Sequence, residues 1–272
     1  MANQDTETVR VTYLNDVKEI VIITINRPSR RNAVDSATAQ KLYDAFRAFE
    51  DNDALKVCVF HGSNGTFCAG YDLHTVSKSL QASELPFPPV SGRNIGNMGP
   101  SRLQVKKPVI AAVSGHAVAG GLELSLIADL RVVEEDAVFG VFCRRWGVPL
   151  IDGGTVRLQA IIGLGRAMDM ILTGRPVTAR EALSMGLANR VVPKGKAVDE
   201  ALALAKQLIG FPWLCMSLDR ESCYYAAYNA TSFEDALSFE FDHGIEAVRK
   251  EAGEGAARFS SGAGRHGSFE KL

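Results

Sequence analysis

A glycine-rich segment carries the residues of this chain that are best suited to chemistry. Residues 114–124 read SGHAVAGGLEL, follow an apolar run at 109–113 and lead into another at 124–128. This pattern predicts a strand, a tight turn and a helix. Glycines let backbone N–H groups approach a ligand closely, and the start of a helix adds partial positive charge. The segment therefore predicts a site that stabilises an anion.

Glu123 stands in the first turn of that expected helix. It is the only acidic or basic residue between Val109 and Ala128, setting aside His116. A carboxyl group in such surroundings either accepts hydrogen bonds from backbone N–H groups at a helix start or exchanges protons with a ligand, with its pKa raised by burial. The two roles do not exclude each other.

A second segment has the same character. Residues 67–73 read FCAGYDL and follow a buried-strand pattern at 57–61. Two such turns lying side by side could each aim one N–H at a single oxygen, which is the arrangement of an oxyanion hole for a thioester enolate. The alternative is that the glycines serve turn geometry alone.

Composition and charge limit the other possibilities. The chain has 272 residues, with 30 basic and 31 acidic residues and a net charge of −1, so no surface for nucleic acid or a membrane is expected. Five cysteines without a CxxC pattern indicate free thiols in a reducing compartment. The N-terminus is polar and acidic, without a signal-peptide pattern. We therefore expect a cytoplasmic protein.

The order of predicted elements is α/β. Alternating and β-branched runs at 9–14 and 20–25 predict a hairpin, a helix is expected from Ser36 as its cap, and a strand follows at 57–61. Strands are again expected at 109–113 and 130–133. The proline-rich segment 85–96 is expected to be a mobile loop, with contact to substrate or a plain surface connection both open.

The two glycine turns together resemble the paired oxyanion motifs of the crotonase, or enoyl-CoA hydratase/isomerase, superfamily. Further matches in order and spacing are INRP at 25–28, RNAV at 31–34, LTGR at 172–175, AREA at 179–182 and GLANRVV at 186–192. The resemblance implies an α/β fold, a crotonase-type spiral of ββα units with a helical C-terminal trimerisation region. It also implies a homotrimer or a dimer of trimers. The implied division is 1–197 for the spiral core with the acyl-CoA site, 198–259 for the helical region and 260–272 for a flexible tail.

The resemblance also implies roles for particular residues. The two oxyanion N–H groups would belong to Tyr71 and Gly120, and Glu123 would act as acid and base. The second glutamate of a standard hydratase falls on Cys143. A thiol is a poor substitute for a carboxyl group, and a small buried apolar role is the plainer interpretation of this cysteine.

Asp152, just before an expected helix start, resembles in position a catalytic aspartate of dienoyl-CoA isomerases and of the dehalogenase branch. It could therefore be the partner of Glu123, or it could cap the helix that begins near Gly153.

A larger set of residues is expected to bind the substrate. Arginines are candidates for the CoA phosphates, main-chain groups for the pantetheine and adenine, and the segment after Phe142 for the acyl group. The arginines could equally be solvated surface charges. The set comprises Arg27, Arg30, Arg31, Ala33, Ala69, Gly70, Asp72, Leu73, Gly121, Cys143, Arg144 and Trp146.

We expect an enzyme that processes acyl-CoA thioesters, and the family resemblance favours an enoyl-CoA hydratase acting on a 2-enoyl-CoA. The alternatives are an enoyl-CoA or dienoyl-CoA isomerase that uses Glu123 and Asp152, and an acyl-CoA binding protein with a degenerate site. No cofactor is expected, because CoA is part of the substrate. No metal is expected either, since His61, His74 and His116 lack the spacing of metal ligands.

Overall fold

The computed structural model describes residues 7–74 and 89–263. Strands and helices alternate up to β9 and only helices follow, which agrees with the α/β order expected from the sequence. The chain divides into two compact units, Met1–Ala205 and Lys206–Leu272. The division expected at 197/198 and the flexible tail stay predictions; residues 264–272 of that tail lie outside the described ranges.

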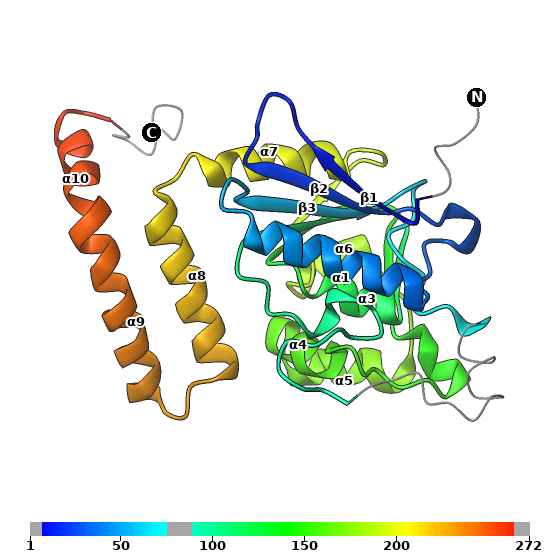
Figure 1. The fold of residues 1–272 in the computed structure, drawn as a ribbon. Coiled ribbons are helices and arrows are strands. Elements are labelled where there is room, and N and C mark those ends of the chain that lie inside the picture. The colour runs from blue at the N-terminus through cyan, green and yellow to red at the C-terminus, as the bar shows by residue number, and fades with distance from the viewer. Residues whose placement is uncertain (1–6, 75–88, 264–272) are drawn as a thin grey trace. The chain divides into compact units, whose positions relative to one another are not determined.

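A six-stranded sheet forms the centre of the first unit (Figure 1). Its strand order is β1 (Val9–Tyr13), β2 (Ile20–Ile25), β3 (Val57–Gly62), β4 (Val109–Val113), β6 (Leu130–Glu134) and β9 (Arg190–Val192). Only the β1–β2 pair is antiparallel, as expected of the hairpin. The continuous apolar runs of β3 and β4 follow from this topology, because parallel strands are covered on both faces.

A three-stranded sheet supports the glycine turn at 119–121. Its strand order is β5 (His116–Val118), β7 (Val138–Gly140) and β8 (Val177–Thr178). β5 pairs in parallel with β7, and Ala119 N–H donates to the carbonyl of Gly140 at 2.9 Å. The turn is therefore continuous with a hydrogen-bonded sheet and is not a free surface loop.

Helix α1 (Ser36–Asp51) lies against β1 and β2. The prediction that Ser36 caps this helix is wrong: Asp35 is the N-cap, and its carboxylate accepts the Thr38 N–H at 2.8 Å. The helix buries Phe46, which meets Phe60 of β3 edge to face with ring centroids 5.1 Å apart. Such contacts add to the burial of apolar area that holds helix and sheet together.

The described part of the proline-rich segment is anchored. Arg93 Nη2 donates to the buried Glu50 carboxylate at 2.6 Å, and Tyr43 Oη donates to the Arg93 carbonyl at 2.8 Å. Residues 89–96 are thus tied to α1, which differs from the expectation of a mobile loop. Residues 85–88 of the same prediction lie outside the described residues.

The remaining elements of the first unit connect or cover these sheets. They are η1 (Pro28–Arg30), η2 (Pro100–Arg102), α3 (Gly120–Ser125), η3 (Phe142–Trp146), α4 (Gly154–Ile162), α5 (Leu164–Thr173), α6 (Ala179–Ser184) and most of α7 (Ala197–Ile209), whose residues 206–209 belong to the second unit. Thr178 caps α6 by accepting the Glu181 N–H.

The second unit consists of α8 (Trp213–Tyr228), α9 (Phe233–Ala247), the π-helical turn η4 (Val248–Ala252) and α10 (Gly253–Ser260). Tyr225 and Phe239 stack between α8 and α9 at 3.9 Å, and the Glu251 carboxylate accepts the N–H groups of Leu214 and Cys215. In the part of the chain that the structure describes, no single helix is long and apolar enough to cross a membrane. Only α7 and α8 taken together, with a bend between them, have the required length and composition.

We predict that Gly121→Ala severely destabilises the first unit. A Cβ at this position would lie 2.0 Å from the Cys68 carbonyl oxygen, so the two segments would have to move apart. We expect a loss of about 3 kcal/mol or more in the free energy of unfolding, measured by denaturant titration. Gly165→Ala in α5 is the control, because its Cβ would meet nothing within 4 Å. A Gly121→Ala protein as stable as this control would contradict the prediction.

Candidate active site

The two glycine turns lie side by side. Cys68 N–H donates to the His116 carbonyl at 2.9 Å, and Val118 N–H donates to the Cys68 carbonyl at 3.1 Å. Beyond this pair, a Cβ on Gly70 would lie 3.1 Å from the Gly120 nitrogen. Gly70 has φ +102°, an angle that favours glycine. A glycine is therefore suited to this position both because it has no Cβ and because it adopts this angle easily.

The N–H of Tyr71 points toward the turn that contains Gly120. On the side of the 69–72 turn that faces residues 31–34, the Gly70 carbonyl accepts the Val34 N–H at 2.8 Å. Because the described peptide bonds are trans, the C=O of Gly70 and the N–H of Tyr71 point in opposite directions. The Tyr71 N–H is thereby turned away from Val34 and toward the side on which Cys68 pairs with β5.

Gly120 supplies the matching donor. It is the first residue of α3, and its N–H makes no hydrogen bond with any other described residue. The preceding Ala119 has φ +53° and ψ −125°, a conformation that costs a residue with a Cβ on the order of 1–3 kcal/mol. The fold thus maintains a strained backbone at the point where it presents this N–H group.

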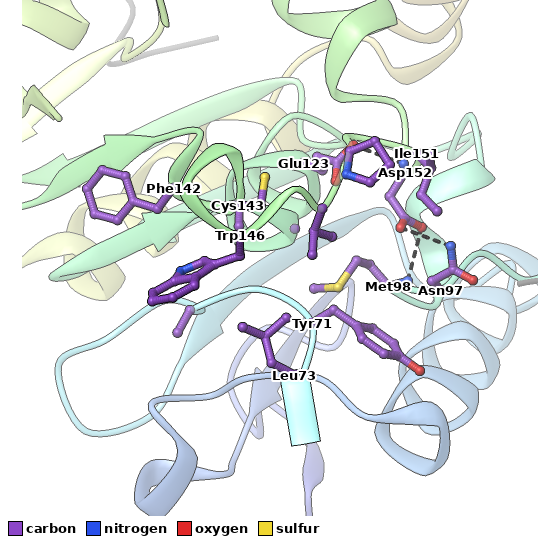
Figure 2. A pocket seen from close by; sticks show the side chains of 15 residues that line it. Tyr71, Leu73, Asn97, Met98, Glu123, Phe142, Cys143, Trp146, Ile151 and Asp152 are labelled. Carbon is purple, nitrogen blue, oxygen red and sulfur yellow. Dashed lines mark hydrogen bonds between the residues drawn. The ribbon is translucent and has the colours of Figure 1, made fainter. Parts of the chain in front are cut away.

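A pocket of about 120 Å³ opens beside these turns (Figure 2). Its lining is largely apolar, with a few polar groups, as is typical of small-molecule sites. It is lined by Ala69, Tyr71, Leu73, Asn97, Met98, Ala119, Gly120, Glu123, Phe142, Cys143, Trp146, Val148, Pro149, Ile151 and Asp152. All four residues expected to be catalytic therefore line one cavity.

Glu123 is almost fully buried, with 3% of its surface exposed. Its Oε1 accepts the N–H groups of Asp152 at 2.9 Å and of Gly154 at 2.8 Å. It therefore binds the start of α4, whereas its own helix has no side-chain cap. Burial, followed by the negative charge of Asp152, raises the pKa of Glu123 to about 8. Such a group can both hold and release a proton near neutral pH.

Asp152 organises the pocket wall. Its Oδ1 accepts the Met98 N–H at 3.0 Å and a short hydrogen bond from Ser101 Oγ, and its Oδ2 accepts from Asn97 Nδ2 at 3.3 Å; dashed lines mark its bonds to Asn97 and Met98 in Figure 2. The alternative that Asp152 caps α4 is wrong, because the N-cap is Gly153 and no side chain bonds there.

The loop that Asp152 holds was not predicted as part of the site. Gly96 and Gly99 exchange two backbone hydrogen bonds of 2.9 Å, which leaves Asn97 and Met98 at the tip of a tight turn. The Met98 side chain packs directly on Gly120, since a Cβ there would lie 2.6 Å from the Met98 sulfur. The only local signal for this turn was its pair of glycines.

Cys143 lines the pocket where a second acid was expected from the resemblance. Only 8% of its surface is exposed, and burial, together with the charge of Glu123, raises the pKa of its thiol. Cys143 is therefore a neutral, weakly polar part of the wall. Trp146 also lines the pocket, although 71% of its surface is exposed.

Arg144 does not line the pocket. Its Nε donates to the Ile171 carbonyl at 3.0 Å, which ties η3 to α5, and the neighbouring Arg145 lies over the Phe142 ring at 5.0 Å. The expectation that Arg144 contacts the substrate is thus not met by this pocket. Among the described residues that line it, none is a lysine or an arginine.

The residues expected to bind CoA fall into three groups. Arg30 and Arg31 are exposed and stay candidates for the phosphates, together with the main chain of Ala33, Ala69 and Leu73. Gly70, Gly121 and Asp72 are buried in the contact between the turns or beside it. Arg27 is engaged with Asp35 and Asp72, which leaves it poorly placed for a phosphate.

The expected structural role of His61 agrees with its surroundings, whereas those of His74 and His116 stay predictions. His61 is hydrogen-bonded to Thr24 at 2.9 Å, and burial lowers its pKa. Within residues 7–74 and 89–263 no group of three potential metal ligands is found.

Comparison with known proteins identifies the family. The model of the enoyl-CoA hydratase/isomerase family matches residues 16–236, and the chain belongs to this family, within the crotonase superfamily. Enoyl-CoA hydratase EchA19 of Mycobacterium tuberculosis is 38% identical over 192 residues, 68% of this chain and 69% of that protein. A carnitinyl-CoA dehydratase of Salmonella arizonae is 35% identical over 75% of each chain.

Solved structures agree. The crystal structure of an enoyl-CoA hydratase from Mycobacterium tuberculosis superimposes with a TM-score of 0.82 at 32% identity, covering 93% of this chain and 96% of that one. The structure of EchA1 from Mycobacterium marinum gives the same TM-score at 31% identity. Processing of acyl-CoA thioesters is thus the family's chemistry.

We predict that Glu123→Gln changes how stability depends on pH. Between pH 4.5, the ordinary pKa of a glutamate, and about 8, the folded protein keeps a proton that the unfolded chain releases. Wild-type stability should therefore fall as the pH rises through this window and level off above it. Gln can accept the same two N–H groups but carries no titratable proton. The advantage of Glu123→Gln in free energy of unfolding should grow by on the order of 4 kcal/mol from pH 5 to pH 9. Parallel stability curves for the two proteins would refute this.

Proposed function

We propose that this chain is an enoyl-CoA hydratase that adds water reversibly to a 2-enoyl-CoA thioester. The observation that carries the proposal is the placement of the buried Glu123 carboxyl in the same pocket as Gly120 and Tyr71. The two backbone N–H groups would polarise the thioester oxygen and stabilise the enolate, each contributing roughly 2.7–4 kcal/mol to lowering the barrier. Protonated Glu123 would donate its proton to the α-carbon, and it would take back the proton that the water releases as its oxygen bonds to the β-carbon, so that the carboxyl group ends in its starting form.

The relatives support a reaction that moves water. One is named a hydratase and another a dehydratase, and both names denote the addition or removal of water. With Cys143 neutral and Asp152 bonded to three donors, Glu123 is the carboxyl group best placed to exchange a proton. We therefore assign it the main part of the proton transfer.

The pocket also favours an uncharged acyl group. No lysine or arginine is among its described lining residues, so a carboxylated acyl chain would lose its hydration without gaining an ion pair. Arg145 covers a face of Phe142 and brings positive charge near the wall, which disfavours a trimethylammonium group such as that of a carnitinyl thioester. An aliphatic enoyl chain carries no charge, so it neither loses the hydration of a charged group nor is repelled by Arg145.

A second candidate is isomerisation of an enoyl-CoA or dienoyl-CoA. It is favoured by the presence of two buried carboxyl groups, Glu123 and Asp152, in one pocket. In that scheme, one carboxyl group removes a proton from the substrate and the other returns one at a different carbon. A third possibility, an acyl-CoA binding protein without turnover, agrees less well with a glutamate whose pKa is raised to about 8.

The assembly and the location of the protein are also proposals. We propose a homotrimer or a dimer of trimers, supported by the large exposed apolar side chains of the second unit, such as Phe233, Phe241 and Phe259. We also propose a cytoplasmic location, supported by the five cysteines without a CxxC pattern.

Incubation with a panel of acyl-CoA thioesters tests the reaction. We expect crotonyl-CoA to gain the mass of one water, measured by mass spectrometry, and 3-butenoyl-CoA to remain unchanged. Conversion of 3-butenoyl-CoA without a change of mass, followed by the absorbance of the conjugated product, would instead support isomerisation. Binding without any conversion would support the acyl-CoA binding protein.

Asp152→Asn separates the two enzymatic schemes. Asparagine can keep its Oδ1 on Met98 and Ser101, and the Asn97 amide can turn to receive the new NH₂ group. For a hydratase we expect most of the turnover to remain. The inflection near pH 8 in kcat/KM should move to lower pH, because the charge of Asp152 contributes to the raised pKa of Glu123, although burial contributes more. A fall in kcat of more than about 100-fold, with unchanged affinity for CoA, would favour the isomerase scheme.

A further inference from the structure

The direction of the Tyr71 N–H depends on a short stretch of chain that is not itself in the pocket. Residues 31–34 run beside the turn at 69–72: Ala69 N–H donates to Arg31 O at 3.1 Å, and Asp72 N–H donates to Val34 O at 2.8 Å. Together with the bond from Val34 N–H to Gly70 O, these contacts orient the peptide between Gly70 and Tyr71. If residues 31–34 move, the Tyr71 N–H moves with them.

That stretch is not held by regular secondary structure. Arg31 and Asn32 have φ values of +50° and +56°, in the left-handed region that residues with a Cβ rarely adopt. At its first end, the Asn32 side chain donates to Ser63 O at 2.9 Å and to Thr66 O at 2.6 Å. The other end, where the chain passes from Ala33 to the start of α1, needs a different anchor.

Arg27 provides this second anchor. Its guanidinium meets Asp35 at 2.7 Å through Nη2, and through Nη1 it meets Asp72 at 3.3 Å and the Ala33 carbonyl in a short hydrogen bond. Only 14% of the Arg27 side chain and 8% of the Asp72 side chain are exposed. One planar group therefore joins the residues that flank Val34 to the residue that follows Tyr71.

The Arg27 fork also explains why this arginine is a poor ligand for a phosphate. Its donors already face two carboxylates and a carbonyl, and binding a phosphate would require at least one of these partners to be released. Asp35 is in addition the cap of α1, and Asp72 Oδ1 accepts the His74 N–H at 3.1 Å. Each partner of Arg27 is thus fixed by a second contact of its own.

We propose that Arg27, paired with Asp72 and Asp35, is a positioning residue that holds the Tyr71 N–H on the oxyanion site; this rests on the function proposed above. It does not touch the substrate and acts only through the 31–34 segment and the 69–72 turn. A displacement of about 1 Å at a group that stabilises the transition state can cost about 100-fold in rate. Loosening this clamp should therefore slow turnover more than it weakens CoA binding.

Arg27→Lys is the first test. Lysine keeps the positive charge but lacks the planar fork, so it cannot meet both carboxylates and the Ala33 carbonyl with the same geometry. Asp72→Asn is the second variant and removes the charge of the other partner while keeping its shape. Arg175→Lys is the matched control, because Arg175 also joins two carboxylates, Asp169 and Glu181, but lies outside the pocket lining.

Kinetics and CoA binding separate the roles. For Arg27→Lys and Asp72→Asn we expect kcat for crotonyl-CoA to fall at least about 10-fold, with the Kd for CoA by calorimetry within about twofold of wild type. The control, Arg175→Lys, should keep the wild-type kcat and the wild-type Kd for CoA. A rise of 10-fold or more in the Kd for CoA at unchanged kcat would show instead that Arg27 is a CoA ligand, and would overturn the proposal.

A measurement without turnover distinguishes failure of this proposal from failure of the proposed function. Butyryl-CoA labelled with ¹³C at its thioester carbonyl should show a lowered C=O stretching frequency when bound to the wild-type protein, because two N–H groups polarise the bond. The two variants should lose part of this shift, and Arg175→Lys should keep it. A full shift in both clamp variants overturns the role of Arg27 and leaves the oxyanion site intact. Bound thioester without any shift in the wild type refutes the oxyanion site, and the role of Arg27 with it.

Discussion

The backbone pairing of Cys68 with β5 is the contact on which the rest of the site depends. It brings two segments that are almost 50 residues apart in the sequence close enough for Gly70 to approach the Gly120 nitrogen and for Gly121 to touch the Cys68 carbonyl. No side chain could occupy that space. The turn at 119–121 continues β5, and the turn at 69–72 is held by backbone hydrogen bonds to residues 31–34, so the N–H groups of both turns are fixed before any substrate arrives and no reorganisation is needed during the reaction.

Glu123 shows how the same construction prepares an acid. It is carried by the helix that presents the Gly120 N–H, and its carboxyl group is oriented by the start of another helix, α4. These two N–H groups favour the charged form, but burial and the nearby Asp152 have the larger effect and raise the pKa of Glu123 to about 8. The contacts that orient the carboxyl group therefore also moderate its acidity, and burial has the largest effect on its pKa.

The sequence was informative where structure is local. The hairpin of β1 and β2 and the strands β3, β4 and β6 follow from periodicity, and the pairing of the two turns followed from the family resemblance. The role of Arg27 and the loop held by Asp152 could not be predicted from the sequence. Asp152 and Met98 are 54 positions apart, and nothing near either residue in the sequence indicates the other. Because they are charged, Arg27 and Arg144 were expected to bind the substrate, whereas both bind other groups of the protein.

The methionine that packs on Gly120 gives this pocket a compliant wall. Met98 is held by its backbone through Asp152, but its side chain is unbranched and rotates about three bonds. The shape of this part of the pocket wall can therefore change through side-chain torsions while the main chain stays fixed. Acyl chains of increasing length would meet a gradually rising resistance as the thioether is pushed aside, and discrimination by length would be graded, without the sharp cut-off that a β-branched or aromatic residue at the same place would impose.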